Sequence, residues 1–198
     1  MHVVKVVAMT AKTRSTVRIF VDSCWILRIR AEEARMTEKR NWSQIFRQAL
    51  VAGIIAGICI EAYLVLTVIV PAHGNVLQVW QWIASAAIGD VAFTNPAYAW
   101  LGLLVHFIIS IAWAGGYAYL AQQQQFMNRR WVISGLVYGL VVYIFMDILL
   151  LGARKFVPPA SALALLNALI AHCVFFGLPL AFVVSRLDAA ATRSPSTL

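Results

Sequence analysis

The sequence predicts an all-α membrane protein, with four transmembrane helices and one further interfacial or re-entrant helix on the outer face of the membrane. Hydrophobic residues make up 62% of the 198 residues, whereas soluble domains contain about 45–50%. Four apolar runs each approach the roughly 20 residues that a helix needs to cross a hydrocarbon core. These runs are apolar all round, without the alternation typical of a transmembrane β-barrel.

The chain is predicted to have three parts, with the four spans together in the middle one. Residues 1–47 form a basic N-terminal segment, residues 48–185 the transmembrane domain, and residues 186–198 a short tail. The spans run from Gln48 to Val70, from Ala97 to Ala121, from Trp131 to Leu151 and from Ser161 to Val184.

Most of the net charge of +8 lies in the N-terminal segment, which holds ten Lys or Arg and four Asp or Glu. No aromatic residues are interleaved with these charges in a nucleic-acid-binding motif, so we expect contacts with anionic lipid and no nucleic-acid partner. The first 35 residues lack the long apolar core and cleavage site of a signal peptide. Met36 opens a short leader before the first span, which suggests that translation starts there.

The positions of the basic residues predict the orientation of the spans. Basic residues are concentrated on the cytoplasmic side of membrane proteins. They precede the first span, follow the second and follow the fourth, which places both termini in the cytoplasm. Arg154 and Lys155, between the third and fourth spans, oppose this rule. The residues that support the orientation are Lys39, Arg40, Arg47, Arg129, Arg130 and Arg186.

The segment from Val76 to Phe93 is nearly long enough to span, but its pattern favours an interfacial helix. Gln78, Gln81, Ser85 and Gly89 share one helical face. Trp80 and Trp82 suit the lipid headgroup region. Counting this segment as a span would also put more basic residues outside. The other face is largely apolar, with Leu77, Trp80, Ala84, Ala87, Ile88 and Val91.

Each predicted span carries one ionisable residue, namely Glu61, His106, Asp147 and His172. Such residues are rare within membranes and normally face the interior of a bundle, because burying a charge in hydrocarbon is costly. Counted from the cytoplasmic end of each span at about 1.5 Å per residue, all four lie about 20–24 Å in. The sequence therefore predicts a buried His/carboxylate layer slightly outward of the midplane.

Glycines lead towards both acids at a spacing of four residues, which places them on one helical face. Gly53 and Gly57 precede Glu61, and Gly135 and Gly139 precede Asp147. Small residues mark the faces on which membrane helices approach closely. We therefore expect these four glycines to lie at helix–helix contacts.

Three interpretations of the polar layer remain open. The first, and our leading one, is that the four side chains pair with one another and organise the bundle. The second is a cofactor site, with His106 and His172 as candidate ligands of haem b or a transition metal. The third is a proton or ion pathway, because buried acids and imidazoles are the usual components of such pathways.

Other features limit the remaining classes of function. The chain has no Gly-rich phosphate loop and no GxSxG motif, which argues against an enzyme. Its three cysteines form no CxxC pair. Besides the lipid bilayer, the expected partners are further copies of the chain or a larger membrane complex, because four spans make a small transporter.

Several stretches of the sequence resemble a family of small bacterial inner-membrane proteins without an established activity. The resemblance covers about Ala49 to Arg186, through the Gln-x-x-x-Ser pattern in VLQVWQWIASAAIGDVAF, the YG of the third span and the GLP of the fourth. It implies four spans in a bacterial cytoplasmic membrane. The family often has Asn at the position of Asp147, which shifts the expected functional weight towards the two histidines.

Overall fold

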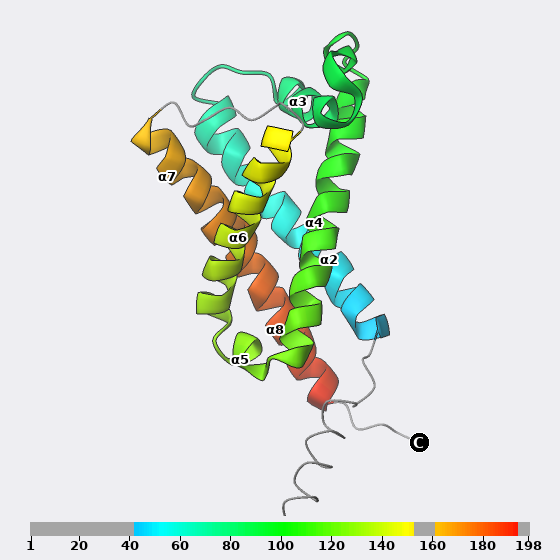
Figure 1. The fold of residues 1–198 in the computed structure, drawn as a ribbon, viewed down its shortest axis with the longest axis vertical. Helices are drawn as coiled ribbons and strands as arrows, with labels where there is room; N and C mark the ends of the chain where they lie inside the picture. Colours follow the sequence, from blue (N-terminus) through cyan, green and yellow to red (C-terminus); the bar gives the residue numbers. More distant parts are fainter. Residues whose placement is uncertain (1–41, 153–160, 194–198) are drawn as a thin grey trace, which may run out of the picture. The chain divides into compact units, whose positions relative to one another are not determined.

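The computed structural model describes residues 42–152 and 161–193, which are helical with no strand among them (Figure 1). Predictions on the first 41 residues, including the start at Met36, lie outside the described part. The elements are α2 (Trp42–Leu64), η1 (Val65–Ile69), α3 (Val76–Ile88), η2 (Gly89–Phe93), α4 (Tyr98–Gln123), α5 (Gln125–Arg129), α6 (Trp131–Gly152), α7 (Ala162–Ile170), η3 (Ala171–Gly177) and α8 (Leu178–Arg193).

Five helical stretches of the described residues are long and apolar enough to cross a membrane, which indicates a membrane protein. Four of them overlap the predicted spans. The first begins at Trp42, before the predicted Gln48, because hydropathy marks the apolar part of a helix and not its ends. The stretches are Trp42–Thr67, Val76–Phe93, Tyr98–Gln123, Trp131–Leu149 and Ala162–Ala191.

Glycines on α2 allow that helix to pack closely against α4. A β-carbon added at Gly53 would lie 2.6 Å from the Cα of Ile111. One added at Gly57 would lie 3.1 Å from the Phe107 ring and 3.2 Å from the Ser110 hydroxyl. The backbones therefore approach to a distance that only glycine permits at Gly53.

A second glycine contact joins α6 to η3. A β-carbon added at Gly135 would lie 2.7 Å from the carbonyl oxygen of Gly177, and one added at Gly139 would lie 2.3 Å from that of His172. Where Gly135 meets η3 both surfaces lack side chains, because Gly177 in turn faces the backbone of Gly135. The small residues thus bring the main chain of the histidine-bearing helix directly against α6.

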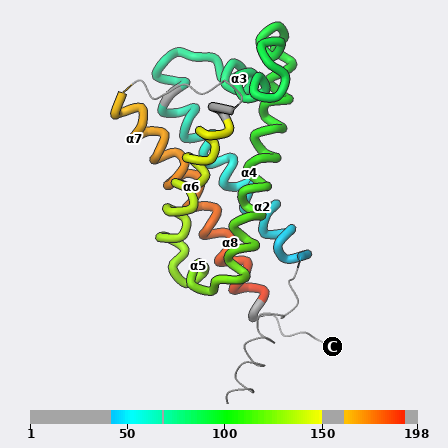
Figure 2. Tube along the Cα trace, viewed as in Figure 1, coloured from blue at the N-terminus to red at the C-terminus, as the bar shows by residue number. Residues whose placement is uncertain are grey.

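The chain runs continuously from α7 to α8 (Figure 2), and between them η3, which includes His172, is wound as a π-helix. In η3 the backbone is π-helical, and the N–H of Leu178 bonds to the carbonyl of Cys173, five residues earlier. Pro179 follows immediately. Because proline lacks an N–H and its ring clashes with the carbonyl four residues before it, a wider turn ahead of Pro179 accommodates the ring.

Helix α3 is a short helix with a clear start and end. The side chain of Asn75 caps its first turn by accepting a hydrogen bond from the N–H of Leu77. Its last turn ends at Gly89, whose φ of 72° suits glycine. Figure 1 shows α3 near the end of α2 and the beginning of α4. Gly102 of α4 touches the main chain of Trp80.

Helix α3 packs on the protein through residues of both faces that its pattern predicted. Gln81 and Ser85 of the polar face are buried beside Ala84 of the apolar face. The exposed residues of α3 include Leu77, Gln78 and Ile88. The amide of Gln81 donates hydrogen bonds to the carbonyls of Ala92 and Asn95, so its burial satisfies main-chain carbonyls in the turn that follows.

Polar contacts also join the helices at the opposite end of the bundle. The Asp188 carboxylate accepts hydrogen bonds from Gln44 at 2.9 Å and from Asn128 at 2.8 Å. These contacts link α8 to α2 and α5. Between this end and the histidines, the core is packed with small and aromatic residues, including Ala114, Tyr117 and Ala118.

Candidate polar site within the bundle

The structure brings Glu61 and His106 together. The Oε2 atom of Glu61 lies 3.9 Å from Nε2 of His106, and the two side chains are only 13% and 15% exposed. Glu61 lies near the end of α2, and His106 lies in the second turn beyond Gly102 of α4. The close α2–α4 packing at Gly57 places these two side chains at the same level.

Trp80 completes this group and was not predicted as a member of it. Its indole N–H donates a hydrogen bond to Oε1 of Glu61. The prediction that Trp80 lies at the lipid headgroups gave no role to its N–H. Because Trp80 belongs to α3, the Glu61 carboxylate joins α2, α3 and α4 at one point.

The imidazole of His106 has a fixed arrangement of its protons. Nε2 lies 3.2 Å from the carbonyl oxygen of Gly57. Since a carbonyl oxygen only accepts, Nε2 carries the proton in this hydrogen bond. In the neutral ring the remaining nitrogen, Nδ1, then holds the lone pair.

The imidazole of His172 also donates a hydrogen bond to a main-chain carbonyl, but through its other ring nitrogen. Its Nδ1 donates to the carbonyl oxygen of Ala168 at 2.9 Å, which leaves the lone pair of the neutral ring on Nε2. The ring lies 5.3 Å from that of Tyr143, centre to centre. Asp147 follows Tyr143 by four residues on α6, so the two lie on the same helical face.

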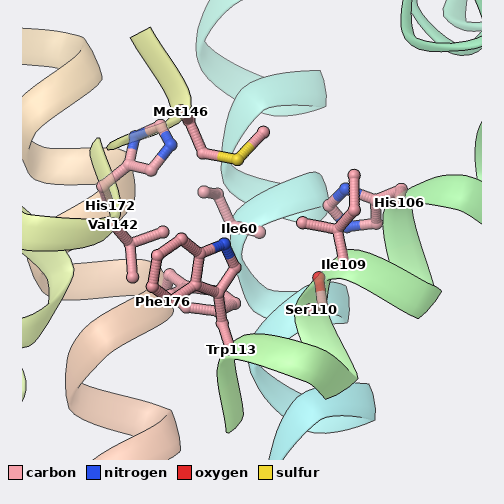
Figure 3. Close-up of a pocket in the computed structure, with 9 residues that line it drawn as sticks. All are labelled: Ile60, His106, Ile109, Ser110, Trp113, Val142, Met146, His172 and Phe176. Carbon is pink, nitrogen blue, oxygen red and sulfur yellow. The ribbon is translucent and has the colours of Figure 1, made fainter. Parts of the chain in front are cut away.

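Both histidines line one cavity of about 70 Å³. Figure 3 shows the His106 ring and the His172 ring on different sides of it, with the Trp113 indole between them and a ring nitrogen of His172 turned inward. Helices α2, α4, α6 and η3 all contribute to the walls. The lining residues are Ile60, His106, Ile109, Ser110, Trp113, Val142, Met146, His172 and Phe176.

A further interhelical bond lies close in sequence to Glu61. The hydroxyl of Tyr63 donates to Oδ1 of Asn167 at 2.6 Å, and the Tyr63 ring stacks on Phe175 with centres 4.1 Å apart. Sequence reasoning missed this pair because neither residue carries a charge at neutral pH. Together they tie α2 to the helix that carries His172.

Of the predicted site residues, Glu61 and His106 lie together, and His172 packs beside Tyr143, one helical turn before Asp147 on α6. Both histidines line the cavity, and neither acid does. All four side chains are partly buried. The four glycines lie at the α2–α4 and α6–η3 contacts.

The cavity does not fit the predicted cofactors. Within residues 42–152 and 161–193, no group of three or more His, Cys, Asp or Glu side chains is arranged to hold a metal ion. The cavity of about 70 Å³ is far smaller than the roughly 300 Å³ at which pockets for small organic molecules begin. Haem b is larger still, so the haem and metal interpretations have no support in this geometry.

Comparison of the chain with protein-family models, with curated proteins and with solved structures finds no match. The functional interpretation therefore depends on the geometry of the polar groups. These groups link helices, and the two histidines among them line a small, partly open cavity.

Proposed function

We propose that the chain is a multi-pass protein of a bacterial inner membrane, with four spans, both termini in the cytoplasm and α3 at the outer surface. The basic residues next to the helix ends support this orientation. The 13 residues of α3 would extend about 20 Å, less than the roughly 30 Å of a hydrocarbon core. The family resemblance in sequence supports the bacterial membrane.

Labelling of single cysteines tests this topology. In a variant without the three native cysteines, Ala72→Cys lies before α3 and Gln125→Cys lies in α5, and both positions are exposed. We expect an impermeant thiol reagent added outside intact cells to label Ala72→Cys and to label Gln125→Cys only after lysis. The reverse pattern would show that the protein is inserted in the opposite direction.

We propose that the polar layer organises the bundle. The observation that carries this proposal is that the Glu61 carboxylate contacts both Trp80 and His106, and so joins three helices. Interhelical hydrogen bonds in membranes contribute about 0.6 to 2 kcal/mol each. We therefore expect Glu61→Ala to loosen α3, measured as faster hydrogen exchange of its amides.

Glu61→Gln is the matched variant for that experiment, because its amide oxygen still accepts from the Trp80 indole. Exchange in α3 should then remain slow. If Glu61→Ala also left the exchange unchanged, the carboxylate would not be what holds α3 against the other helices.

A second candidate function is proton transfer through the same layer. It is favoured by the two imidazoles, each of which donates one N–H to a main-chain carbonyl and keeps a second nitrogen for exchange. We expect purified protein in liposomes to dissipate a pH gradient, and His106→Gln to abolish the flux. His73→Asn, at an exposed residue outside the bundle, is the control. A flux unaffected by His106→Gln would exclude this candidate.

A further inference from the structure

We propose that the cavity between His106 and His172 is a binding site for water, and that about two water molecules there bridge the two imidazoles. The proposal names the ligand of the site described above. It rests on the candidate function of proton transfer only for the last step, the movement of a proton along the bridge.

The size of the cavity is the first argument. Its volume of about 70 Å³ leaves room for at least two water molecules, because roughly 10–15 Å³ of such space is enough to hold one. A chain of two waters therefore fits in this space.

The polar groups in the walls are the second argument. A buried water needs two to four hydrogen-bond partners. The cavity offers imidazole groups from His106 and His172, the hydroxyl of Ser110 and the indole of Trp113, whose nitrogen faces the space between the imidazoles (Figure 3). Two waters therefore have enough partners here, whereas a wholly apolar cavity of this size would stay dry.

The proton arrangement of the two rings gives the third argument. Each neutral ring has one N–H committed to a main-chain carbonyl, at Gly57 for His106 and at Ala168 for His172. Each ring therefore offers an acceptor nitrogen and has no second N–H to donate. Two acceptors cannot hydrogen-bond each other, but each can accept from a water, and the waters can bond to one another.

Such a bridge would also provide a path along which a proton can pass from His106 to His172. When His106 carries a proton on both ring nitrogens, the N–H bond that is not committed to the Gly57 carbonyl can break, and its proton passes to the first water. That water releases a different proton to the second water, which gives one to the lone pair of His172. One N–H bond is lost, one is formed, and both waters remain neutral after they reorient.

Solid-state NMR on the whole chain in liposomes, with ¹⁵N-labelled histidine, tests the water site directly. We expect magnetisation from water to reach the ring nitrogens of both His106 and His172. The chain contains only four histidines, so single variants assign the signals. Absence of transfer to either ring in the wild-type protein would overturn the proposal.

A pair of neighbouring substitutions separates cavity water from bulk water. Ile109 lines the cavity, whereas Ile108 is 56% exposed on the outside of the bundle. We expect Ile109→Phe to reduce the transfer to both rings at least several-fold and Ile108→Phe to leave it unchanged. Unchanged transfer in a folded Ile109→Phe variant would mean that the water reaches the rings by another route, and would overturn the proposal.

Measuring the proton flux through liposomes with the same variants separates the proposed water site from the proposed function of proton transfer. Water at both rings without any flux would establish the water site and exclude the transport function. Should Ile109→Phe fail to fold, the wild-type spectrum still decides whether water is present at both imidazoles.

Discussion

Replacing Gly139 by alanine should push α6 away from the helix that carries His172. The added β-carbon would lie 2.3 Å from the carbonyl oxygen of His172 and 2.7 Å from the Cα of Cys173, whereas ordinary contact begins at 3.4 Å. All of the nearest atoms belong to the main chain, so no side chain can rotate away. The helices must therefore separate by about 1 Å, which loses a quarter to a half of the dispersion energy across the contact.

The expected cost follows from two opposing effects. Forcing an extra carbon into a packed interior costs about 1–3 kcal/mol. Alanine favours a helix over glycine by about 1 kcal/mol, which offsets part of that loss. We therefore expect Gly139→Ala to reduce the free energy of unfolding by up to about 2 kcal/mol.

Gly115→Ala in α4 is the matched control, because its added β-carbon would meet only the β-carbon of Ala49, at an ordinary 3.5 Å. This variant should be neutral or stabilised by up to about 1 kcal/mol. Both can be measured by reversible denaturant unfolding in detergent micelles, followed by circular dichroism. Equal stability of the Gly139→Ala and Gly115→Ala variants would refute the close approach of α6 to η3.

Two further substitutions probe single hydrogen bonds in the same assay. Trp80→Phe removes the N–H that binds Glu61 and should cost about 1.5–3 kcal/mol, because the acceptor is a carboxylate; Trp82→Phe is the control, and equal effects of the two would argue against the bond. Tyr63→Phe removes the hydroxyl that binds Asn167 but keeps the ring, so a loss of about 1 kcal/mol is expected. A neutral Tyr63→Phe would show that this bond does not hold α2 to α7.

Much of the site could be predicted because the relevant signals are local in the sequence. The length and hydropathy of a run determine whether it forms a helix that can cross a bilayer. The spacing of four residues between Gly53, Gly57 and Glu61 places them on one face of a helix whatever the neighbours are. Counting residues from the end of each predicted span in the same way predicts one polar group per span at about the same depth.

The partners of those groups could not be predicted in this way. The pairing of Trp80 with Glu61 depends on how α3 is rotated and on its height beside α2, and both are decided by packing between helices. Nothing in its sequence pattern indicated that Gln81 would be buried, because its amide is satisfied by carbonyls of the following turn.

The sequence by itself determined the helical class, the apolar character of the long helices and the four ionisable positions, because composition and periodicity are properties of each segment alone. Only the tertiary structure decided which side chains meet. It separated the acids from the cavity and placed both imidazoles on the cavity wall. The physical reason is that contacts between helices depend on their rotation, tilt and height, which are fixed jointly by the packing of all the helices.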